Sequence, residues 1–329
     1  MSLDILKNII SDFYNVPLIQ EKVSLKDKNW FFTGGNASYY VEPSDIDGFI
    51  FALDFAKKNN HKVFVLGQGA NILINDKDFD GLVIKPQLKY ISIKDFDDEY
   101  SLITAASGVV FQDLINKCLE NNLIGLEEFS GIPGTVGGSV YINIHYFEFL
   151  LSQFLHSATV IEKSTGKILM VDNAWFNFGY NNSTLQSKQY YLIDATFKLK
   201  NADIFKIAYA KGRRDEIIRH RVKRYPNKGT CGSFFRNFYE DEVTLESGGK
   251  KMIHVAYYLD KIGIKGMLRV GDAIVSYQHA NMIVNLGAAT TTDIITLVRQ
   301  IQQMVKDQYG IVPKPECQLI GFKEYPLLD

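Results

Sequence analysis

The sequence predicts an α+β protein, and three observations support that fold class. The 329 residues include 46% hydrophobic and 13% aromatic side chains, enough for a substantial core and about two domains, or more if they are small. Both β-branched runs and amphipathic helical stretches occur along the chain. They do not follow strict strand-helix alternation, which argues against a parallel α/β sheet.

The first part of the chain predicts two helices and several strands. Residues 1–25 follow an amphipathic helical pattern. The stretch ASYYVEPSDIDGFIFALDFAKKNN then predicts a strand, a turn at Pro43 and a helix that is capped by Ser44 and ends at Asn59 and Asn60. After it, KVFVLGQGANILIND predicts a buried strand, a glycine turn and a second strand.

The middle of the chain is rich in short strands. Between about residues 80 and 125, GLVIKP, KYISIKD and YSLITAASGVV predict strands, and an amphipathic helix over FQDLINKCLENN follows them. Residues 155–199 add three more strands, in SATVIEK, KILMVD and YYLIDATFKLK.

Two helices and a strand are expected in the last third. KIAYAKGRRDEIIRHRVKRYP predicts a helix and is the most basic segment, either as a solvated helix face or as an attraction for an anionic substrate. A second helix begins beside the possible cap Thr292 and stops at Gly310, with apolar residues at helical spacing: Ile294, Leu297, Val298, Ile301 and Val305. PECQLIGF then predicts a last strand.

Charge and cysteine content narrow the function class. Thirty-six basic and 37 acidic residues give a net charge of −1 without a long run of either sign, so we expect a small-molecule partner, not nucleic acid or a membrane. Cys118, Cys231 and Cys317 are odd in number and far apart, which fits a reducing cytosol and no disulfide framework. The first residues lack a signal-peptide pattern, and the histidines lack metal-ligand spacing. We therefore expect a cytoplasmic protein without a metal, monomeric or a weak homo-oligomer.

Two glycine clusters are candidate ligand sites, because glycine is needed where φ is positive or where a ligand touches the backbone. LGQGANILI is followed by a strand-like run, so it is not a dinucleotide-binding fingerprint. SGIPGTVGGSVYIN leads into an apolar run that we expect to be a strand, and it lacks the lysine of a P-loop. Two interpretations remain: tight turns, or turns whose free N–H groups form a nest for a pyrophosphate.

Seven sequence blocks occur in a fixed order between about residues 28 and 322: FFTGGNASYYVEP, VLGQGANILINDKDFDGLVI, GLEEFSGIPGTVGGSVYIN, FGYNNSTLQ, GTCGSFFRNF, IKGMLRVGDAIVSYQHANMIVN and PECQLIGF. In this order they resemble the UDP-N-acetylenolpyruvoylglucosamine reductase family, also called UDP-N-acetylmuramate dehydrogenases. The resemblance implies a two-part FAD-binding domain of the vanillyl-alcohol oxidase type plus a smaller α+β substrate domain. The parts are expected at residues 1–80, with a C-terminal strand in 312–329 returning to them, at 81–205, and at 206–311.

The resemblance also implies the chemistry. NADPH reduces FAD, and flavin N5 passes hydride to the enolpyruvyl group of UDP-N-acetylglucosamine enolpyruvate, giving UDP-N-acetylmuramate for peptidoglycan. The glycine clusters are then implied to approach FAD through main-chain atoms, where a side chain would collide. The residues concerned are Gly67, Gly69, Ala70, Asn71, Gly131, Ile132, Pro133, Gly134, Thr135, Gly137 and Gly138.

Two catalytic residues are implied in the same way. Ser233, in the Gly-Ser-Phe-Phe block, maps onto the serine that protonates the enolate carbon, although an isolated serine there would be read as a polar turn residue. Glu316 maps onto a glutamate beside the substrate carboxylate, where the like charge would hold it protonated as a hydrogen-bond donor. On an alternating strand Glu316 shares a face with Gln318 and Ile320; the alternative is an exposed carboxylate at the end of the strand.

The chain also departs from the family pattern. The family arginine that binds the enolpyruvyl carboxylate is replaced in Tyr180-Asn181-Asn182-Ser183, and asparagine brings no charge. Bulky His145, Tyr146 and Phe147 stand where small residues are usual, and Phe32 precedes Gly34 where a basic residue is common. We expect Tyr180, Asn181 and Arg236 to bind substrate. Arg213, Arg214 and Arg236 are candidates for the missing charge, with solvated side chains as the alternative.

Three functions stay open on the sequence alone. The first is the family reaction. The second is a related flavoprotein that reduces a different unsaturated nucleotide sugar, which the loss of the arginine favours. The third is a flavin-binding protein without catalysis. His279 is expected to be packed and hydrogen-bonded, and Cys231 to be a neighbour of the flavin without acting as a nucleophile.

Overall fold

The computed structural model describes residues 17–329, and the chain in it forms two compact units. Unit 1 consists of the described residues up to Val23, Ala37–Gln68 and Asp80–His220. Unit 2 consists of Ser24–Asn36, Gly69–Phe79 and Arg221–Asp329. Each unit is therefore built from three segments that are separated in the sequence.

The first sheet of unit 1 begins with a correction to the predicted N-terminal helix. Residues 1–16 of that helix lie outside the described residues, but Gln20–Ser24 is a strand, so the prediction is wrong there. A four-stranded sheet has the order β1 (Gln20–Ser24), β2 (Asn36–Val41), β5 (Phe79–Ile84) and β3 (Lys62–Val65). Helix α2 (Ile46–Lys58) connects β2 to β3 and is capped by Asp45, which accepts a hydrogen bond from Gly48 N, not by Ser44 as predicted.

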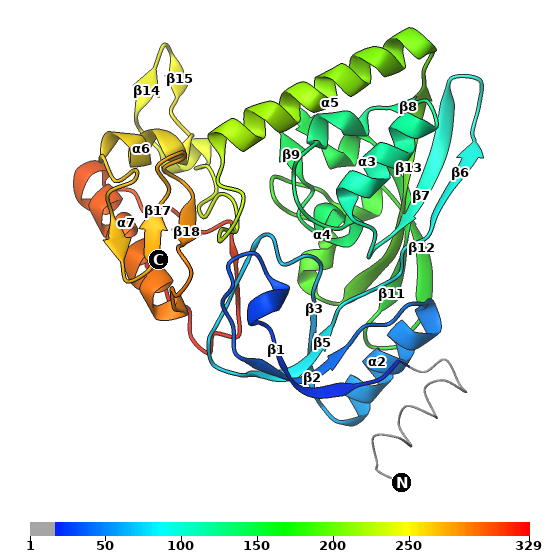
Figure 1. Ribbon diagram of the computed structural model, residues 1–329, viewed down its shortest axis with the longest axis horizontal. Coiled ribbons are helices and arrows are strands. Elements are labelled where there is room, and N and C mark those ends of the chain that lie inside the picture. Colours follow the sequence, from blue (N-terminus) through cyan, green and yellow to red (C-terminus); the bar gives the residue numbers. More distant parts are fainter. Residues whose placement is uncertain (1–16) are drawn as a thin grey trace. The chain divides into compact units, whose positions relative to one another are not determined.

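A six-stranded antiparallel sheet forms the larger part of unit 1 (Figure 1). Its strands, in spatial order, are β12 (Ile168–Asp172), β11 (Leu155–Glu162), β13 (Tyr190–Asn201), β7 (Tyr100–Ala106) and β6 (Ile91–Asp95), and β8 (Leu123–Ile124) also pairs with β13. Strand β13 alternates buried and more exposed side chains, with Ala195 and Phe197 fully buried. Helices α3 (Phe111–Glu120) and α4 (Val136–Tyr141) cover one face.

Helix α4 overturns the predicted strand in SGIPGTVGGSVYIN. Thr135 accepts a hydrogen bond from Gly138 N as the N-cap, and Val136 and Val140 are fully buried where α4 packs against β13 and β7. A short apolar run fits a strand or a buried helical turn equally well, because its periodicity is too short to separate them. The Thr135 cap and the contact with the sheet decide for the helix.

Short elements complete unit 1. They are four 3₁₀ turns, η2 (Leu126–Phe129), η3 (Leu151–Gln153), η4 (Ala174–Phe176) and η5 (Thr184–Ser187), and the hairpin of β9 (His145–Tyr146) and β10 (Phe149–Leu150). The basic segment is helix α5 (Ile204–Arg224), as predicted.

Unit 2 has its own sheet and core. A three-stranded sheet of β16 (Arg269–Val270), β17 (Ala273–Val275) and β18 (Ile283–Asn285) packs with α6 (Val255–Lys261) and α7 (Thr291–Tyr309). The smaller elements are η1 (Lys26–Lys28), η6 (Glu240–Glu242), the β14 (Glu246–Ser247) and β15 (Lys250–Lys251) hairpin, and β4 (Ile72–Ile74) paired in parallel with β19 (Gln318–Ile320).

Helix α7 has the predicted spacing of apolar residues, but it begins earlier than predicted. All five predicted core positions are buried, and Gly310, at φ +72°, ends the helix. The N-cap is Thr290, not Thr292: its hydroxyl accepts a hydrogen bond from Asp293 N, and Asp293 accepts one from Thr290 N. With mixed strands and helices in both units, the α+β fold class is confirmed.

Candidate active site

The start of the first glycine cluster, Gly67 and Gln68, meets the second cluster within unit 1. Gly134 N donates a hydrogen bond of 2.9 Å to Gln68 Oε1. A Cβ atom added to Gly67 would lie 2.8 Å from Thr135 Oγ1, which is too close for any side chain. The structure therefore brings together parts of two segments, which at the hydrogen bond between Gly134 and Gln68 are 66 positions apart in the sequence.

Several of these glycines are required by the protein's own packing. A Cβ on Gly69 would lie 2.6 Å from Asn29 Cα, and Gly69 also has φ of +68°. A Cβ on Gly137 would lie 3.1 Å from both Cβ and the carbonyl oxygen of Ser107. The bare backbone at Gly67, Gly69 and Gly137 thus has a structural cause that needs no ligand.

Gly134 and Gly138 differ from that group. A Cβ on Gly138 would meet only Thr135 Oγ1, at 3.7 Å, and one on Gly134 only Ser139 Oγ, at 3.8 Å. Gly134 still needs to be glycine, because its φ is +147°, but the space beside both residues is open. These are the two positions at which a ligand has room to touch the backbone.

Of the two interpretations left open, tight turns or a nest of free N–H groups, the nest is contradicted for most of this turn, because its N–H groups are not free. Gly131 N donates to Gln112 Oε1, Val136 N to Val109 O and Gly137 N to Ser107 O, each at 2.9 Å. Gly134 N is bound to Gln68, as described above. Because these groups already have acceptors in the protein, an anion would bind here through the remaining polar groups or by displacing the Gln68 side chain.

Two buried oxygens in these segments are available for a ligand. Among the described residues, neither Asn71 Oδ1 nor Ser107 Oγ has a hydrogen-bond partner, and a buried polar atom without one carries a free-energy cost. Ser107 was missed by the sequence analysis, because a lone serine after a strand carries no signal. Within unit 1, open space at Gly134 and Gly138 and the unpartnered Ser107 Oγ fit a polar cofactor. The other predicted contacts, Ala70, Ile132 and Pro133, are half-buried.

Ser233 and Glu316 come together in unit 2. Phe234, directly after Ser233, accepts a 2.8 Å hydrogen bond from Glu316 N, and Phe235 forms a bridge with Pro315. Ser233 itself forms a bridge with Met282. Strand β19 begins only at Gln318, so the predicted position of Glu316 on an alternating strand is wrong, and this backbone pairing places it instead.

Asn281 holds the segment that carries Ser233. Its side-chain oxygen accepts from Phe235 N at 3.0 Å, and its side-chain nitrogen donates to Phe235 O at 2.7 Å. Its backbone oxygen accepts from Phe234 N at 2.8 Å. The sequence analysis did not single out Asn281, because its role exists only through residues 46 positions away.

The cysteines of unit 2 are buried beside this segment. Burial raises the pKa of the Cys317 thiol well above its ordinary value, and its contact with the Cys231 thiol raises it further. Cys231 and Cys317 are 3% and 2% exposed. A buried thiol with a raised pKa, such as that of Cys317, is a poor nucleophile. That Cys231 lies beside the flavin without acting as a nucleophile stays a prediction.

Tyr180 and Asn181 belong to unit 1. Asn181 has φ of +53°, and neither Oδ1 nor Nδ2 has a hydrogen-bond partner among the described residues although both atoms are buried. Asparagine adopts this left-handed conformation more readily than arginine. The Tyr180 ring lies 5.0 Å from the ring of His145, whose pKa is lowered by burial, so that the imidazole stays neutral.

All three candidate replacement cations have carboxylate partners, and that of Arg214 is its sequence neighbour Asp215, at 3.3 Å. Arg213 binds both oxygens of Glu128, and Arg236 binds both oxygens of Glu242 at 2.7 Å. Arg214 differs, because its buried Nε has no hydrogen-bond partner among the described residues. The structure thus leaves Arg214 as the candidate with an unused donor.

Comparison with known proteins gives the family. Residues 37–172 match the FAD binding domain, and residues 224–320 match the C-terminal domain of UDP-N-acetylenolpyruvoylglucosamine reductase. A curated UDP-N-acetylenolpyruvoylglucosamine reductase from Clostridium novyi is 30% identical over 321 residues, which cover 97% of each chain. The chain belongs to the UDP-N-acetylenolpyruvoylglucosamine reductase family. The reductase of this name from Caldicellulosiruptor saccharolyticus is 31% identical over 96% of each chain.

A solved structure supports the fold assignment within the UDP-N-acetylenolpyruvoylglucosamine reductase family. The enzyme from Thermus caldophilus superimposes with a TM-score of 0.74 at 25% identity, covering 92% of this chain and 99% of that one. The FAD-binding assignment is therefore confirmed, and the matched region contains both glycine clusters. In residues 17–329, no helix is long and apolar enough to cross a membrane, and no cluster of His, Cys, Asp and Glu could hold a metal ion.

Proposed function

We propose that this chain is an FAD-dependent, NADPH-using reductase that converts UDP-N-acetylglucosamine enolpyruvate to UDP-N-acetylmuramate, a peptidoglycan precursor. The observation that carries the proposal is similarity to reductases of this family over almost the whole chain, with FAD-binding and C-terminal domains matched in order. The pairing of the Ser233 and Glu316 segments in unit 2 supports it.

The cofactor is assigned to the glycine clusters. In unit 1, Gly134 and Gly138 offer open backbone, and Ser107 offers a buried oxygen that has no hydrogen-bond partner among the described residues. When bound, FAD accepts hydride from NADPH and delivers it to the enolpyruvyl double bond. The remaining predicted contacts with FAD, Gly67, Gly69 and Gly137 among them, shape the turns because they allow close packing against Thr135, Asn29 and Ser107.

Ser233 is proposed to supply the proton. Hydride addition to the terminal carbon leaves a carbanion stabilised as an enolate, and the Ser233 hydroxyl donates its proton to the carbon that carries the ether oxygen. Asn281 fixes the Ser233 backbone through Phe234 and Phe235, so that the hydroxyl is held in one place. Glu316, held beside it by the hydrogen bond to Phe234, is proposed to donate a hydrogen bond to the enolate oxygen.

Asn181 favours a second candidate function. Its uncharged side chain stands at the sequence position of the family arginine that meets the enolpyruvyl carboxylate, and both of its polar atoms lack partners in residues 17–329. Loss of such a charged donor costs roughly 100- to 1000-fold in rate. The second candidate is therefore a reductase for another unsaturated nucleotide sugar, in which Tyr180 and Asn181 contact a neutral group.

The remaining assignments are proposals of the same kind. We place the enzyme in the cytoplasm, where NADPH and nucleotide sugars are found, as a monomer or weak homo-oligomer. A net charge of −1 without charged runs agrees with no nucleic-acid partner. The FAD-binding part is proposed to span residues 1–80 with the returning segment 312–329, and 81–205, and the substrate part 206–311.

Anaerobic stopped-flow absorbance tests the reaction. The protein is loaded with FAD, reduced with NADPH and mixed with UDP-N-acetylglucosamine enolpyruvate, and reoxidation of the flavin is followed. Fast reoxidation supports the proposal. If the flavin stays reduced with this substrate but reacts with another unsaturated nucleotide sugar, the second candidate replaces it. A protein that binds FAD but is not reoxidised by any of them has no reductase activity.

Ser233→Ala separates the two half-reactions. NADPH should reduce the flavin at the normal rate, because proton donation is not needed in that step, and reoxidation by substrate should slow roughly 100- to 10,000-fold. Ser247→Ala, at an exposed serine of unit 2, is the control and should leave both steps unchanged. An unchanged reoxidation rate in Ser233→Ala would remove this serine from the mechanism.

A further inference from the structure

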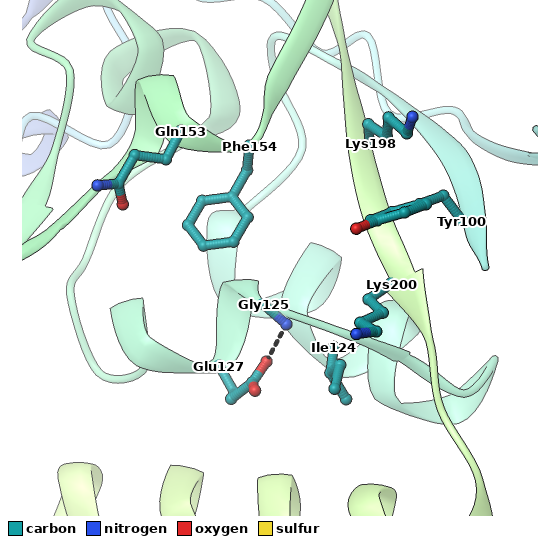
Figure 2. A pocket seen from close by; sticks show the side chains of 8 residues that line it. All are labelled: Tyr100, Ile124, Gly125, Glu127, Gln153, Phe154, Lys198 and Lys200. Carbon is teal, nitrogen blue, oxygen red and sulfur yellow. Dashed lines mark hydrogen bonds between the residues drawn. The ribbon is translucent and has the colours of Figure 1, made fainter.

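Unit 1 contains an open pocket that none of the predicted site residues lines. Its volume is about 320 Å³, at the small end of the range of ligand pockets. Figure 2 shows Phe154 on one side and Tyr100, Lys198 and Lys200 on the other, with Ile124, Gly125 and Glu127 along a third. Gln153 completes the lining.

One wall of the pocket is a rigid sheet surface. Lys200 on β13 pairs in register with Tyr100 on β7 and with Ile124 on β8, so their side chains stand next to one another on the same face. Lys198, two residues away on the same strand, has the same orientation. The positions of these side chains are set by the antiparallel pairing and not by a loop.

The opposite wall is equally fixed. The Phe154 ring packs edge-on against Phe129, with ring centroids 6.0 Å apart. It also lies so close to the backbone of Gly125 that a Cβ there would be 2.7 Å from its Cε1 atom. Lys198 N donates a 2.9 Å hydrogen bond to Phe154 O, which ties this wall to the sheet. The aromatic wall is therefore formed before any ligand arrives.

The charges in the pocket are not paired with one another. Glu127 accepts a hydrogen bond from Gly125 N at 2.5 Å, and among residues 17–329 neither Glu127 nor Lys200 forms an ion pair. Burial raises the pKa of Glu127, because the carboxylate is poorly solvated. Lys198 is different: it lies 3.8 Å from Asp97 and over the rings of Phe96 and Tyr100. Lys200 and Glu127 are thus the unused cation and anion.

We propose that this pocket binds a small zwitterion of the amino-acid type with an apolar side chain. The ligand's carboxylate pairs with Lys200, its ammonium group pairs with Glu127, and its apolar part lies against Phe154 and Tyr100. A simple anion would leave Glu127 unpaired and close to a like charge, and a simple cation would do the same with Lys200. Only a ligand with both charges satisfies both residues.

The site is coupled to the chain that forms the glycine turn. Glu127 lies in η2 (Leu126–Phe129), which is followed at once by Ser130 and Gly131, and Gly131 N is fixed by Gln112. The same glutamine donates hydrogen bonds to the carbonyl oxygens of Phe129 and Ile132. A ligand bound to Glu127 therefore contacts the segment that leads into the candidate cofactor turn.

Three matched probes test the charge requirement on the full-length protein. L-phenylalanine carries both charges, 3-phenylpropionate only the carboxylate and 2-phenylethylamine only the ammonium group. Titration calorimetry and ligand-observed NMR should show saturable binding of L-phenylalanine and at least about fivefold weaker binding of the other two. Equal affinity for 3-phenylpropionate, or no saturable binding of L-phenylalanine in the millimolar range, would overturn the proposal.

Two variants assign each charge to its residue. Lys200→Met should weaken the binding of L-phenylalanine to about the affinity of 2-phenylethylamine. Glu127→Gln should weaken the binding of L-phenylalanine to about the affinity of 3-phenylpropionate, and its amide oxygen can still accept the hydrogen bond from Gly125 N. Lys94→Met, at an exposed lysine of β6 outside the lining, is the control and should bind like the unaltered protein. Unchanged discrimination among the three probes in both variants would contradict the assignment.

Discussion

His279 shows how one buried side chain links the pH of the solution to the fold. Burial and, to a smaller extent, the positive charge of Arg224 lower its pKa to about 4. Its Nδ1 accepts a 3.2 Å hydrogen bond from Asn281 N, and its ring packs on Tyr225 at 5.4 Å. Protonation at Nδ1 would break the hydrogen bond next to the residue that holds the Ser233 segment.

We expect His279 to make unit 2 acid-sensitive. The pKa is lower in the folded state than its ordinary value of 6.5, so the unfolded chain binds more protons between pH 6.5 and about 4. Stability is then full above pH 6.5 and falls, by at most about 3 kcal/mol, as the pH drops through this window. Urea unfolding from pH 7 to 4 measures it.

In the His279→Gln variant, we expect the free energy of unfolding to depend less on pH between 6.5 and about 4. His156→Gln, at an exposed histidine of unit 1, is the control and should keep the profile of the unaltered protein. If His279→Gln and the unaltered protein lose stability in parallel on acidification, another group is responsible.

Gly137 and Gly138 are neighbours with different reasons for being glycine. Gly137→Ala should destabilise the protein with or without FAD, because its Cβ would press on Ser107 at 3.1 Å. Gly138→Ala has room and a helical backbone, so the FAD-free protein should gain up to about 1 kcal/mol. If FAD lies against Gly138, its affinity should fall.

The comparison needs two measurements on each variant, thermal unfolding without FAD and FAD titration by fluorescence. Gly212→Ala, at a glycine of α5 with open space beside it, is the control and should change stability but not FAD affinity. Full FAD affinity in Gly138→Ala would show that the cofactor does not approach this position.

At the scale of elements, the segment with Ser233 is positioned by backbone pairing between parts of unit 2. It lies between the loop before β18, through Asn281 and Met282, and the segment before β19, through Pro315 and Glu316. Three segments distant in sequence thus meet around Ser233 and the two phenylalanines after it, and the buried amide of Asn281 makes two of the hydrogen bonds between them.

Asn281→Ala should therefore reduce both stability and turnover. It leaves Phe235 N and Phe235 O without partners in a buried region, which costs about 2–4 kcal/mol in urea unfolding. The rate of flavin reoxidation by substrate should fall with little change in NADPH-driven reduction, because only the Ser233 segment loses its support. Asn227→Ala, at an exposed asparagine of unit 2, is the control and should leave stability and both half-reactions unchanged. Normal reoxidation in a folded Asn281→Ala protein would show that this amide does not position Ser233.

At the scale of the whole molecule, the chain builds two separate hydrophobic cores. One contains the buried residues of the six-stranded sheet with α2, α3 and α4, and the other those of α6, α7 and β16–β18. The second core also includes Phe31 and Leu73, which come from the first quarter of the sequence. Each core is closed only when distant segments of the chain meet.

Two cores predict that unfolding of the FAD-free protein is not two-state. Calorimetry should give two transitions. Phe197→Ala, in the core of unit 1, should lower the midpoint temperature of only one transition, and Leu297→Ala, in α7, that of only the other. Each substitution should reduce the unfolding free energy of its unit by about 2–5 kcal/mol. A single unfolding transition, with a midpoint temperature that both variants lower equally, would contradict this prediction.

The sequence predicted an element correctly where one local signal was much stronger than its alternatives. The apolar spacing in α7 and the glycine at its end predicted that helix, because burial on one face and a left-handed C-terminal residue are properties of neighbours in sequence. The predicted strand at SVYIN and the predicted cap at Ser44 failed, because packing against β13 and the Asp45 hydrogen bond outweighed equally good local alternatives. Glycine content alone did not separate Gly137, which packs on Ser107, from Gly138, which faces open space.

The sequence by itself determined the α+β class, most strands and helices, and, through its ordered motifs, the family. These depend on periodicity and on residue types that are read along the chain. Only the tertiary structure decided how Ser233 and Glu316 meet, which glycines leave room for a ligand, and that Glu127 and Lys200 line one pocket. The reason is that hydrogen bonds, burial and unpaired charge depend on distances between residues far apart in sequence, which no local pattern encodes.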